Sequence, residues 1–338
     1  MMRTLNDIRP SLYYASFAEL IRSVKFILDK GVDVNAQGED YDNALRATFQ
    51  EDHDQVMQML LVKEVDVNAQ DEEYCNALHA ASARDHDQVV RMLLAKEVNV
   101  NAQDEHYGNA LQTTSQEDHD QVMQMLLVKG VNVNAQDALY GNALQATSAR
   151  DHDQVMQMLL VKEVDVNAQG EYYGNALQAA SQEDHDQVMQ MLLIKEVDVN
   201  AQDEQYGNAL QTAAFKDYDQ VIQILLAKEV DVNAQDEQYG NALQAASYRD
   251  HDQVMQLLLN HDAVINRKNI QGRTSFHLIS AEKQMKTVET LSSFESDSTI
   301  IDMQERNCLH HAIFKDFIEI VNLLLKKDFD SNYADRDG

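Results

Sequence analysis

The chain has 338 residues, of which 44% are apolar and 7% aromatic, a composition that supports a buried core and excludes a disordered chain. Lys and Arg total 27 against 57 Asp and Glu, a formal charge of -30, so the surface repels nucleic acids and anionic membranes and favours a protein partner with a basic surface. Two cysteines are too few for a disulfide framework and no apolar run could span a bilayer, which predicts an intracellular protein, cytoplasmic rather than nuclear.

One tetrapeptide, Val-Asn-Ala-Gln, recurs along most of the chain with a period of 33 residues. Its asparagine falls at Asn35, Asn68, Asn101, Asn134, Asn167, Asn200 and Asn233. Asn266 keeps this register further along, and Thr299 and Asn332 occupy the next two slots. A fixed period without insertions predicts an array of equivalent structural units.

Each unit predicts, in chain order, a short helix, a break, a second helix and an extended segment. In the second unit Asn43 is a good N-cap for the first helix, and Leu45 is expected to face inward. Val56, Leu60 and Leu61 form the apolar stripe of the second helix. Neither helix is long enough to be stable alone, so neighbouring units must stack to bury a core.

The single predicted domain, residues 1–338, has three parts. These are an N-terminal half repeat at 1–37, near-identical acidic repeats at 38–266 and divergent repeats at 267–338. Residues 1–262 carry 17 basic and 45 acidic side chains, whereas residues 263–338 carry 10 and 12. The acidic character therefore belongs to the first three quarters of the chain.

The unit resembles the ankyrin repeat, because Asn-Ala-Leu-Gln stands where ankyrins have Thr-Pro-Leu-His, and residues 272–277 (GRTSFH) are closer still. The resemblance covers essentially the whole chain. It implies an all-α repeat solenoid of about ten helix-turn-helix units with β-hairpin fingers and a concave groove that binds proteins. The wording YGNALQAAS with DVNAQ is similar to the ankyrin arrays of fungal signalling (NACHT-type) proteins. This leaves an alternative function as a sensor or regulatory arm, or a relic, of a larger nucleotide-binding signalling protein.

Two sites where ankyrins usually have glycine carry acids here. Asp stands before the second helix at Asp52, Asp85, Asp118, Asp151, Asp184, Asp217 and Asp250, and Glu follows it at Glu64, Glu97, Glu163, Glu196 and Glu229. Glycine remains at the second site only in Gly31 and Gly130. Because Glu adopts the left-handed backbone region poorly, we expect a softer array than an idealised one.

The recurring Asp-His-Asp, at His53, His86, His119, His152, His185 and His251, invites a metal reading. Neighbouring helices pack about 8–10 Å apart, so histidines of different units are too far apart to share one ion. Tyr218 also replaces the histidine without disturbing the register. We therefore expect a structural role, as a cap and inter-helix hydrogen bond. No catalytic motif is present, so we predict neither an enzyme nor a cofactor.

Candidate partner-binding residues are aromatic and basic side chains at positions that vary between units, together with a tyrosine that recurs at the base of each finger tip and the apolar or aromatic residues that precede it in some units. Those at the end of the first helix are Phe215, Lys216, Tyr248 and Arg249, and those at the finger tips are Leu139, Tyr140, Tyr172, Tyr173, Tyr206 and Tyr239. The alternative for both sets is local packing between neighbouring loops or fingers. The paired methionines of the second helix, such as Met57 and Met59, are expected to fill the core.

Overall fold

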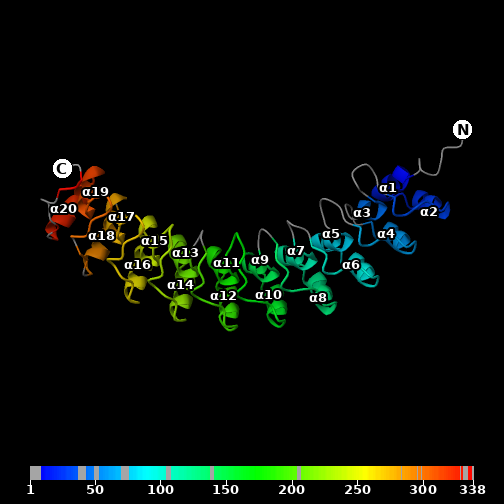
Figure 1. Ribbon diagram of the computed structural model, residues 1–338, viewed down its shortest axis with the longest axis horizontal. Helices are drawn as coiled ribbons and strands as arrows, with labels where there is room; N and C mark the ends of the chain where they lie inside the picture. Colours follow the sequence, from blue (N-terminus) through cyan, green and yellow to red (C-terminus); the bar gives the residue numbers. More distant parts are fainter. Residues whose placement is uncertain are drawn as a thin grey trace. The chain divides into compact units, whose positions relative to one another are not determined.

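The computed structural model describes residues 9–36, 43–48, 53–69, 76–103, 108–137, 141–203, 207–282, 284–294, 296–297, 299–327, 329 and 334–336. In these residues the chain forms 20 helices in consecutive pairs (Figure 1). The first helices of the pairs are α1 (Arg9–Phe17), α3 (Ala44–Ala47), α5 (Ala77–Ala83), α7 (Ala110–Glu117), α9 (Ala143–Ser148), α11 (Ala176–Gln182), α13 (Ala209–Lys216), α15 (Ala242–Arg249), α17 (Ser275–Ala281) and α19 (Cys308–Phe314). The second helices are α2 (Ile21–Asp29), α4 (Asp54–Leu61), α6 (Asp87–Leu94), α8 (Asp120–Val128), α10 (Asp153–Leu160), α12 (Asp186–Leu192), α14 (Asp219–Leu226), α16 (Asp252–Leu259), α18 (Met285–Ser292) and α20 (Ile318–Lys326).

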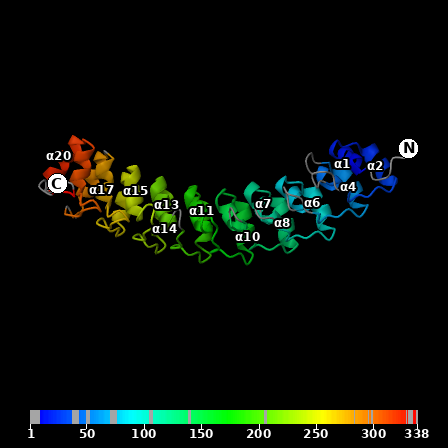
Figure 2. The same ribbon diagram turned by 45° about the horizontal axis from the view of Figure 1, so that its top comes forward.

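The chain divides into two compact units, one of residues 1–147, 152–165 and 170–172 and the other of the remaining residues. Within the first, first helices pack on first helices (α1 on α3, α5 on α7) and second helices on second helices (α4 on α6, α6 on α8). The second unit repeats this scheme, with α13 packed on α15 and α12 on α14 (Figure 2). The predicted all-α repeat solenoid of about ten helix pairs is confirmed.

The sequence features expected to start each helix and form its core do so. The Asn43 side chain accepts a hydrogen bond from the Arg46 N–H at 2.9 Å, which caps α3. Leu45, Val56 and Leu60 are no more than 1% exposed. The expectation for the methionines is correct for Met57 and its repeats, which are fully buried, whereas Met59 reaches the surface.

The expected β-hairpin fingers are tight turns in the described residues. Asp203 and Gly207 form an isolated antiparallel bridge, with the Asp203 N–H donating to the Gly207 carbonyl at 3.1 Å. The Asp236 N–H bonds the Gly240 carbonyl at 3.0 Å in the same way. The glycine has a positive φ, 67° at Gly207 and 78° at Gly240, which suits a residue without a Cβ. Each of these two fingers is therefore closed by one or two backbone hydrogen bonds.

The periodic asparagine joins each repeat to the next. Its amide oxygen accepts a hydrogen bond, at 2.6 to 3.0 Å, from the backbone N–H that lies 31 residues further along the chain. This bond recurs at Asn35, Asn68, Asn101, Asn134, Asn167, Asn200, Asn233 and Asn266. Because the bond needs a partner one repeat away, it fixes the repeat length at this position.

A second link comes from the buried glutamine of Asn-Ala-Leu-Gln. In the fourth repeat the Gln112 oxygen accepts from the Asn109 N–H at 2.6 Å, and its nitrogen donates to the Gly141 carbonyl of the next repeat at 2.7 Å. Gln244 donates likewise to the Arg273 carbonyl at 2.8 Å. One side chain thus caps its own helix and holds the following finger.

Nine acids at the usual glycine sites adopt the left-handed backbone, whereas Glu97 and Glu163 do not have a positive φ. Six aspartates between Asp85 and Asp250 have φ values of 57° to 69°, and Glu64, Glu196 and Glu229 have 55°, 58° and 50°. Gly130, at the same position as these glutamates, has a φ of 77°, and a Cβ there would meet no atom within 4 Å. Backbone conformation, and not lack of space, makes glycine favourable at this site.

We therefore predict that Glu196→Gly and Glu229→Gly each stabilise the array by about 1 kcal/mol, because glycine adopts this conformation without strain. The change would raise the midpoint of urea denaturation followed by circular dichroism. The reverse substitution, Gly130→Glu, is the matched control and should lower the midpoint by a similar amount. Unchanged midpoints in all three variants would show that these sites carry no strain.

Candidate functional site

The recurring histidines bridge neighbouring repeats through their rings. The imidazole Nδ1 lies 2.9 to 3.0 Å from a backbone carbonyl at the first helix of the preceding repeat. This contact recurs at His53, His119, His152, His185 and His251. At the second helices these rings form no cap hydrogen bond, so the expectation of a capping side chain is wrong. A carbonyl partner requires a proton on Nδ1, and the expected inter-helix bond is therefore confirmed.

Three of the predicted contact residues form the centre of a mixed cluster in the second unit, which we call the aromatic–basic patch (Phe215, Lys216, Tyr239, Tyr248 and Arg249). The Phe215 ring at the end of α13 lies 4.6 Å from the Tyr239 ring of the following finger, centroid to centroid. The Arg249 guanidinium of the next repeat lies over the Phe215 ring at 4.4 Å. The end of α13, the following finger and the end of α15 thus meet at one phenylalanine.

The other two members of the patch are held by polar contacts. The Lys216 Nζ donates to the Gln182 carbonyl of the preceding repeat at 2.9 Å. Tyr248 is half-buried. Burial raises the pKa of its phenol, while Arg273 and a hydrogen bond to Asn269 act in the opposite direction. Local packing, the alternative for this set, explains some of the contacts of each side chain. Lys216 and Arg249 nevertheless remain exposed.

The finger-tip candidates are only partly described. Tyr172 is 50% exposed, and Tyr173 is half-buried. Leu139, Tyr140 and Tyr206 lie outside the described residues. Of the six tip residues, the structure therefore brings Tyr239 into the patch and leaves Tyr172 on the surface.

Two aspartates per repeat form an acidic edge where the two helices of each pair meet. Burial raises the pKa of Asp120, and the neighbouring charges of Asp118 and Asp85 raise it further. Burial likewise raises the pKa of Asp184, with Asp186 and Asp219 adding to the effect. Carboxylates of adjacent repeats are thus close enough to repel one another.

The acidic edge ends in the eighth repeat, where the next repeat supplies a cation. Lys286 Nζ lies 2.9 Å from an oxygen of Asp252, and the Thr290 hydroxyl donates to the other oxygen. Burial alone would raise the pKa of Asp252, but the hydrogen bonds from Thr290 and Lys286 lower it. The Thr287 hydroxyl also donates to Asp250. The chain therefore contains one example of this edge binding an ammonium group.

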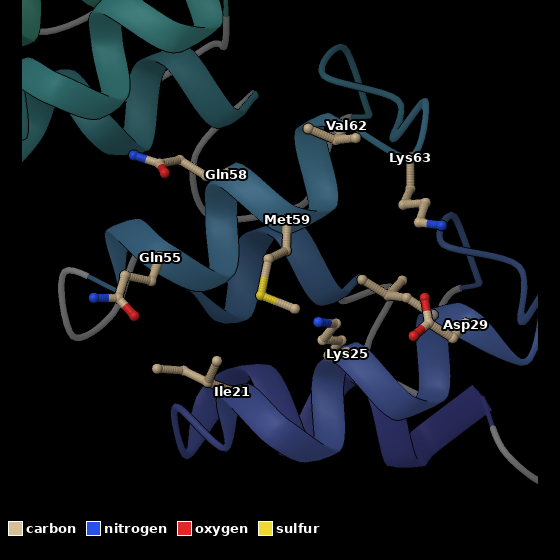
Figure 3. A pocket seen from close by; sticks show the side chains of 9 residues that line it. Ile21, Lys25, Asp29, Gln55, Gln58, Met59, Val62 and Lys63 are labelled. Carbon is tan, nitrogen blue, oxygen red and sulfur yellow. The ribbon is translucent and has the colours of Figure 1, made fainter.

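A separate apolar groove of about 670 Å³ lies between α2 and α4 in the first unit. Ile21 and Met59 line it, with Lys25 and Lys63 beside them. In Figure 3 the Met59 side chain extends from α4 towards α2. A smaller groove of about 340 Å³ repeats this arrangement between α6 and α8. Each groove can hold an aliphatic side chain. Sequence reasoning did not find the grooves, because these methionines were expected to fill the core.

A buried polar cluster lies between the ninth and tenth repeats. The Asp302 side chain, fully buried, lies 2.9 Å from both Arg306 Nη2 and His311 Nε2. Burial alone would raise the pKa of Asp302, but these hydrogen bonds and those from the backbone hold it well below its usual range. The His277 ring packs edge-on against His311, with centroids 5.6 Å apart. His277 Nε2 donates to the Arg306 carbonyl at 3.2 Å, the contact that glutamine makes in earlier repeats.

Comparison with known proteins settles the family. The model of ankyrin repeats in three copies matches residues 12–104, 110–203, 178–269, 210–301 and 243–335. The chain belongs to the ankyrin repeat family. The human ASB11 ankyrin repeat domain has a similar structure, with a TM-score of 0.56 and 21% sequence identity, over 63% of this chain and 96% of that domain. No curated protein matches the chain.

Ankyrin folds are typically non-catalytic, and their repeats are generally protein–protein interaction modules. In the part of the chain that the structure describes, no group of three or more His, Cys, Asp and Glu side chains is placed to hold a metal ion. None of the described helices is long and apolar enough to cross a membrane.

Sequence reasoning found the patch but missed the Lys286–Asp252 pair and the Asp302 cluster. Both are in or next to the divergent repeats, and both are marked by residues that differ from the repeated sequence. Lys286 replaces a glutamine of the earlier repeats, and His277 replaces the glutamine at Gln244. Departures from a near-copied pattern identify such sites better than residue type alone.

His277 makes this ankyrin array sensitive to acid. Burial, together with the nearby His311, lowers its pKa from 6.5 to about 4. Below pH 6.5 the unfolded chain therefore binds a proton that the folded chain does not, and stability falls down to about pH 4 by on the order of 3 kcal/mol. We predict that His277→Gln removes this part of the pH dependence, because glutamine makes the same contacts at Gln244.

The measurement is urea denaturation of both forms between pH 7.5 and 4. The two stability curves should be parallel above pH 7 and separate as the pH falls. Gln244→Ala is a control for loss of the inter-repeat bond without loss of a titrating group. Parallel curves over the whole range would show that the pKa of His277 is the same in the folded and the unfolded chain.

Proposed function

We propose that this ankyrin array is a non-catalytic scaffold that binds a partner protein with a basic surface. The aromatic–basic patch supplies the main contact energy, and the acidic edge guides the partner. Tyr172 and the finger-tip residues Leu139, Tyr140, Tyr173 and Tyr206 belong to the same proposed surface. An intracellular and cytoplasmic location is part of this proposal.

The observation that carries the proposal is the contact of Phe215 with both Tyr239 and Arg249. Interface hot spots are enriched in aromatic residues and arginine, and rigid rings lose little conformational entropy on binding. Phe215 is held in place by its neighbours before any partner arrives, so the cost of ordering it is already met by folding. Repeats with glutamine or alanine at this position have no such ring.

The charge of the chain supports a basic partner. Burial and neighbouring carboxylates raise the pKa values of Asp120 and Asp184. An approaching cation therefore stabilises the ionised forms of both side chains. Lys286 on Asp252 is an intramolecular example of that interaction. Complementary charge mainly increases the association rate and weakens with salt.

The alternative is that the array is a sensor or regulatory arm, or a relic, of a larger nucleotide-binding signalling protein. It rests on the similarity of the repeated wording to fungal arrays of that type. A binding surface on such an arm would still use the patch, so the two proposals differ in what the binding controls.

We predict that the double variant Phe215→Ala, Tyr248→Ala loses the partner recovered by the intact chain in affinity purification read by mass spectrometry. Removal of two hot-spot rings should weaken binding at least tenfold, because each contributes more than about 1 kcal/mol. Recovery by the intact chain should also fall as salt rises.

The control is Tyr14→Ala with Phe26→Ala, which removes two exposed aromatic side chains, 66% and 64% accessible, in the first repeat. Thermal unfolding of both variants reports on folding. Equal recovery by both double variants, or no partner for the intact chain, would refute binding through the patch.

A further prediction concerns the acidic edge. Asp118→Asn, Asp184→Asn and Asp217→Asn together remove three charges at left-handed positions, where asparagine is tolerated. The association rate with the recovered partner should fall about threefold or more at low salt, and its dependence on ionic strength should become shallower. Stopped-flow mixing measures both.

The matched control removes three charges elsewhere, at the exposed Asp165, Asp198 and Asp231. If the edge guides the partner, this control should change the rate less. Equal effects of the two triple variants would mean that only net charge matters.

A further inference from the structure

Arg249 differs from the other basic side chains of this region in its surroundings. Its guanidinium lies against the Phe215 ring, and among the described residues it has no ion pair and no side-chain hydrogen bond. Arg306, by contrast, is paired with Asp302 at 2.9 Å. An arginine without a carboxylate is unexpected in a chain with a formal charge of -30.

The nearest aspartates in sequence, Asp250 and Asp252, are engaged with other groups. Asp250 accepts a hydrogen bond from the Thr287 hydroxyl, and Lys286 Nζ lies 2.9 Å from Asp252. Lys216 is directed to the Gln182 carbonyl. The donors on the edge of the Arg249 guanidinium therefore remain available in the folded chain.

Stacking on a ring orients a guanidinium by its face and leaves its edge free. Five N–H donors lie in the plane, and a pair of them matches the two oxygens of a carboxylate. Contact with Phe215, itself in contact with Tyr239, restricts the motion of the arginine before a ligand binds. The result is a preorganised oxyanion site at the surface of the second unit.

We propose that Arg249 is a carboxylate-binding site, which receives an aspartate, glutamate or C-terminal carboxylate of the partner next to an aromatic or apolar group. This rests on the proposed function, since it assigns the chemistry of one contact within the aromatic–basic patch. The partner would then be basic over its broad surface and acidic at a single anchor. A carboxylate is favoured over a phosphate because a single negative charge is repelled less by this acidic chain than a double one.

The test uses phenylacetate as the probe and the Arg249 Nε–Hε signal of the ¹⁵N-labelled intact chain as the readout. Arg249→Lys assigns the signal. At constant ionic strength, phenylacetate should shift this signal saturably, whereas neutral phenethyl alcohol should not. Phenyl phosphate at pH 8 should bind at least threefold more weakly than phenylacetate.

The chain offers internal controls at the same position of other repeats. Arg84 and Arg150 are equivalent to Arg249, but the repeats before them have glutamine where Phe215 stands. Their signals should shift much less. Phe215→Gln converts the site to their type and should lower the affinity for phenylacetate at least threefold, with the other arginine signals unchanged as evidence of folding.

An unshifted Arg249 signal, equal shifts at Arg84 and Arg150, or tighter binding of phenyl phosphate would each overturn the carboxylate assignment. The titration needs no partner protein, so such a failure leaves the protein-binding proposal intact. Failure of the partner to depend on Phe215 and Tyr248 would refute that proposal independently.

Discussion

The hydrogen bond from the periodic asparagine to the backbone of the next repeat is the constraint on which this array depends. Its acceptor and donor are 31 residues apart at every described joint. An insertion of one residue would break this bond, whose partners are exposed to solvent, at a cost of about 0.5–1.5 kcal/mol per joint. The glutamine at Gln112 and its equivalents adds a second bond across the same joint. The unbroken period of 33 residues in the sequence follows from these hydrogen bonds.

These bonds also separate positions that are fixed from positions that are free. Residues that contact the next repeat through polar atoms are nearly identical from copy to copy, whereas those beside the joint vary. Phe215 and Arg249 belong to the second group, and the ring of one repeat contacts the cation of the next. Such variation is available for function because it leaves the stacking unchanged. The patch is therefore located by where the array tolerates change.

The sequence was sufficient for the fold, because the period, the N-cap at Asn43 and the buried stripe of Val56 and Leu60 are local patterns with one physical solution. It was insufficient for contacts between repeats. Capping by the histidines was the natural reading of Asp-His-Asp at the start of a helix, yet His119 bonds the Ser82 carbonyl of the repeat before. Met59 reads as core by its spacing but lines a groove. In each case the deciding partner lies about one period away, beyond the reach of local pattern.

The distribution of charge gives the two ends of the array different tasks. Along the acidic edge, burial and then the neighbouring carboxylates of Asp118 and Asp85 raise the pKa of Asp120. At the eighth repeat Lys286 pairs with Asp252, and beyond it Asp302 pairs with Arg306 and His311 inside the protein. The divergent repeats thus use these charges to hold the structure together, whereas Asp120 and Asp184 of the acidic repeats lie among like charges. Repulsion between like charges destabilises a fold and has a physical benefit only when something of opposite sign binds to them. Phe215 and Arg249 lie in the two repeats that directly precede, in the sequence, the repeat that supplies Lys286, so within the second unit a partner held at the aromatic–basic patch is next to both kinds of repeat.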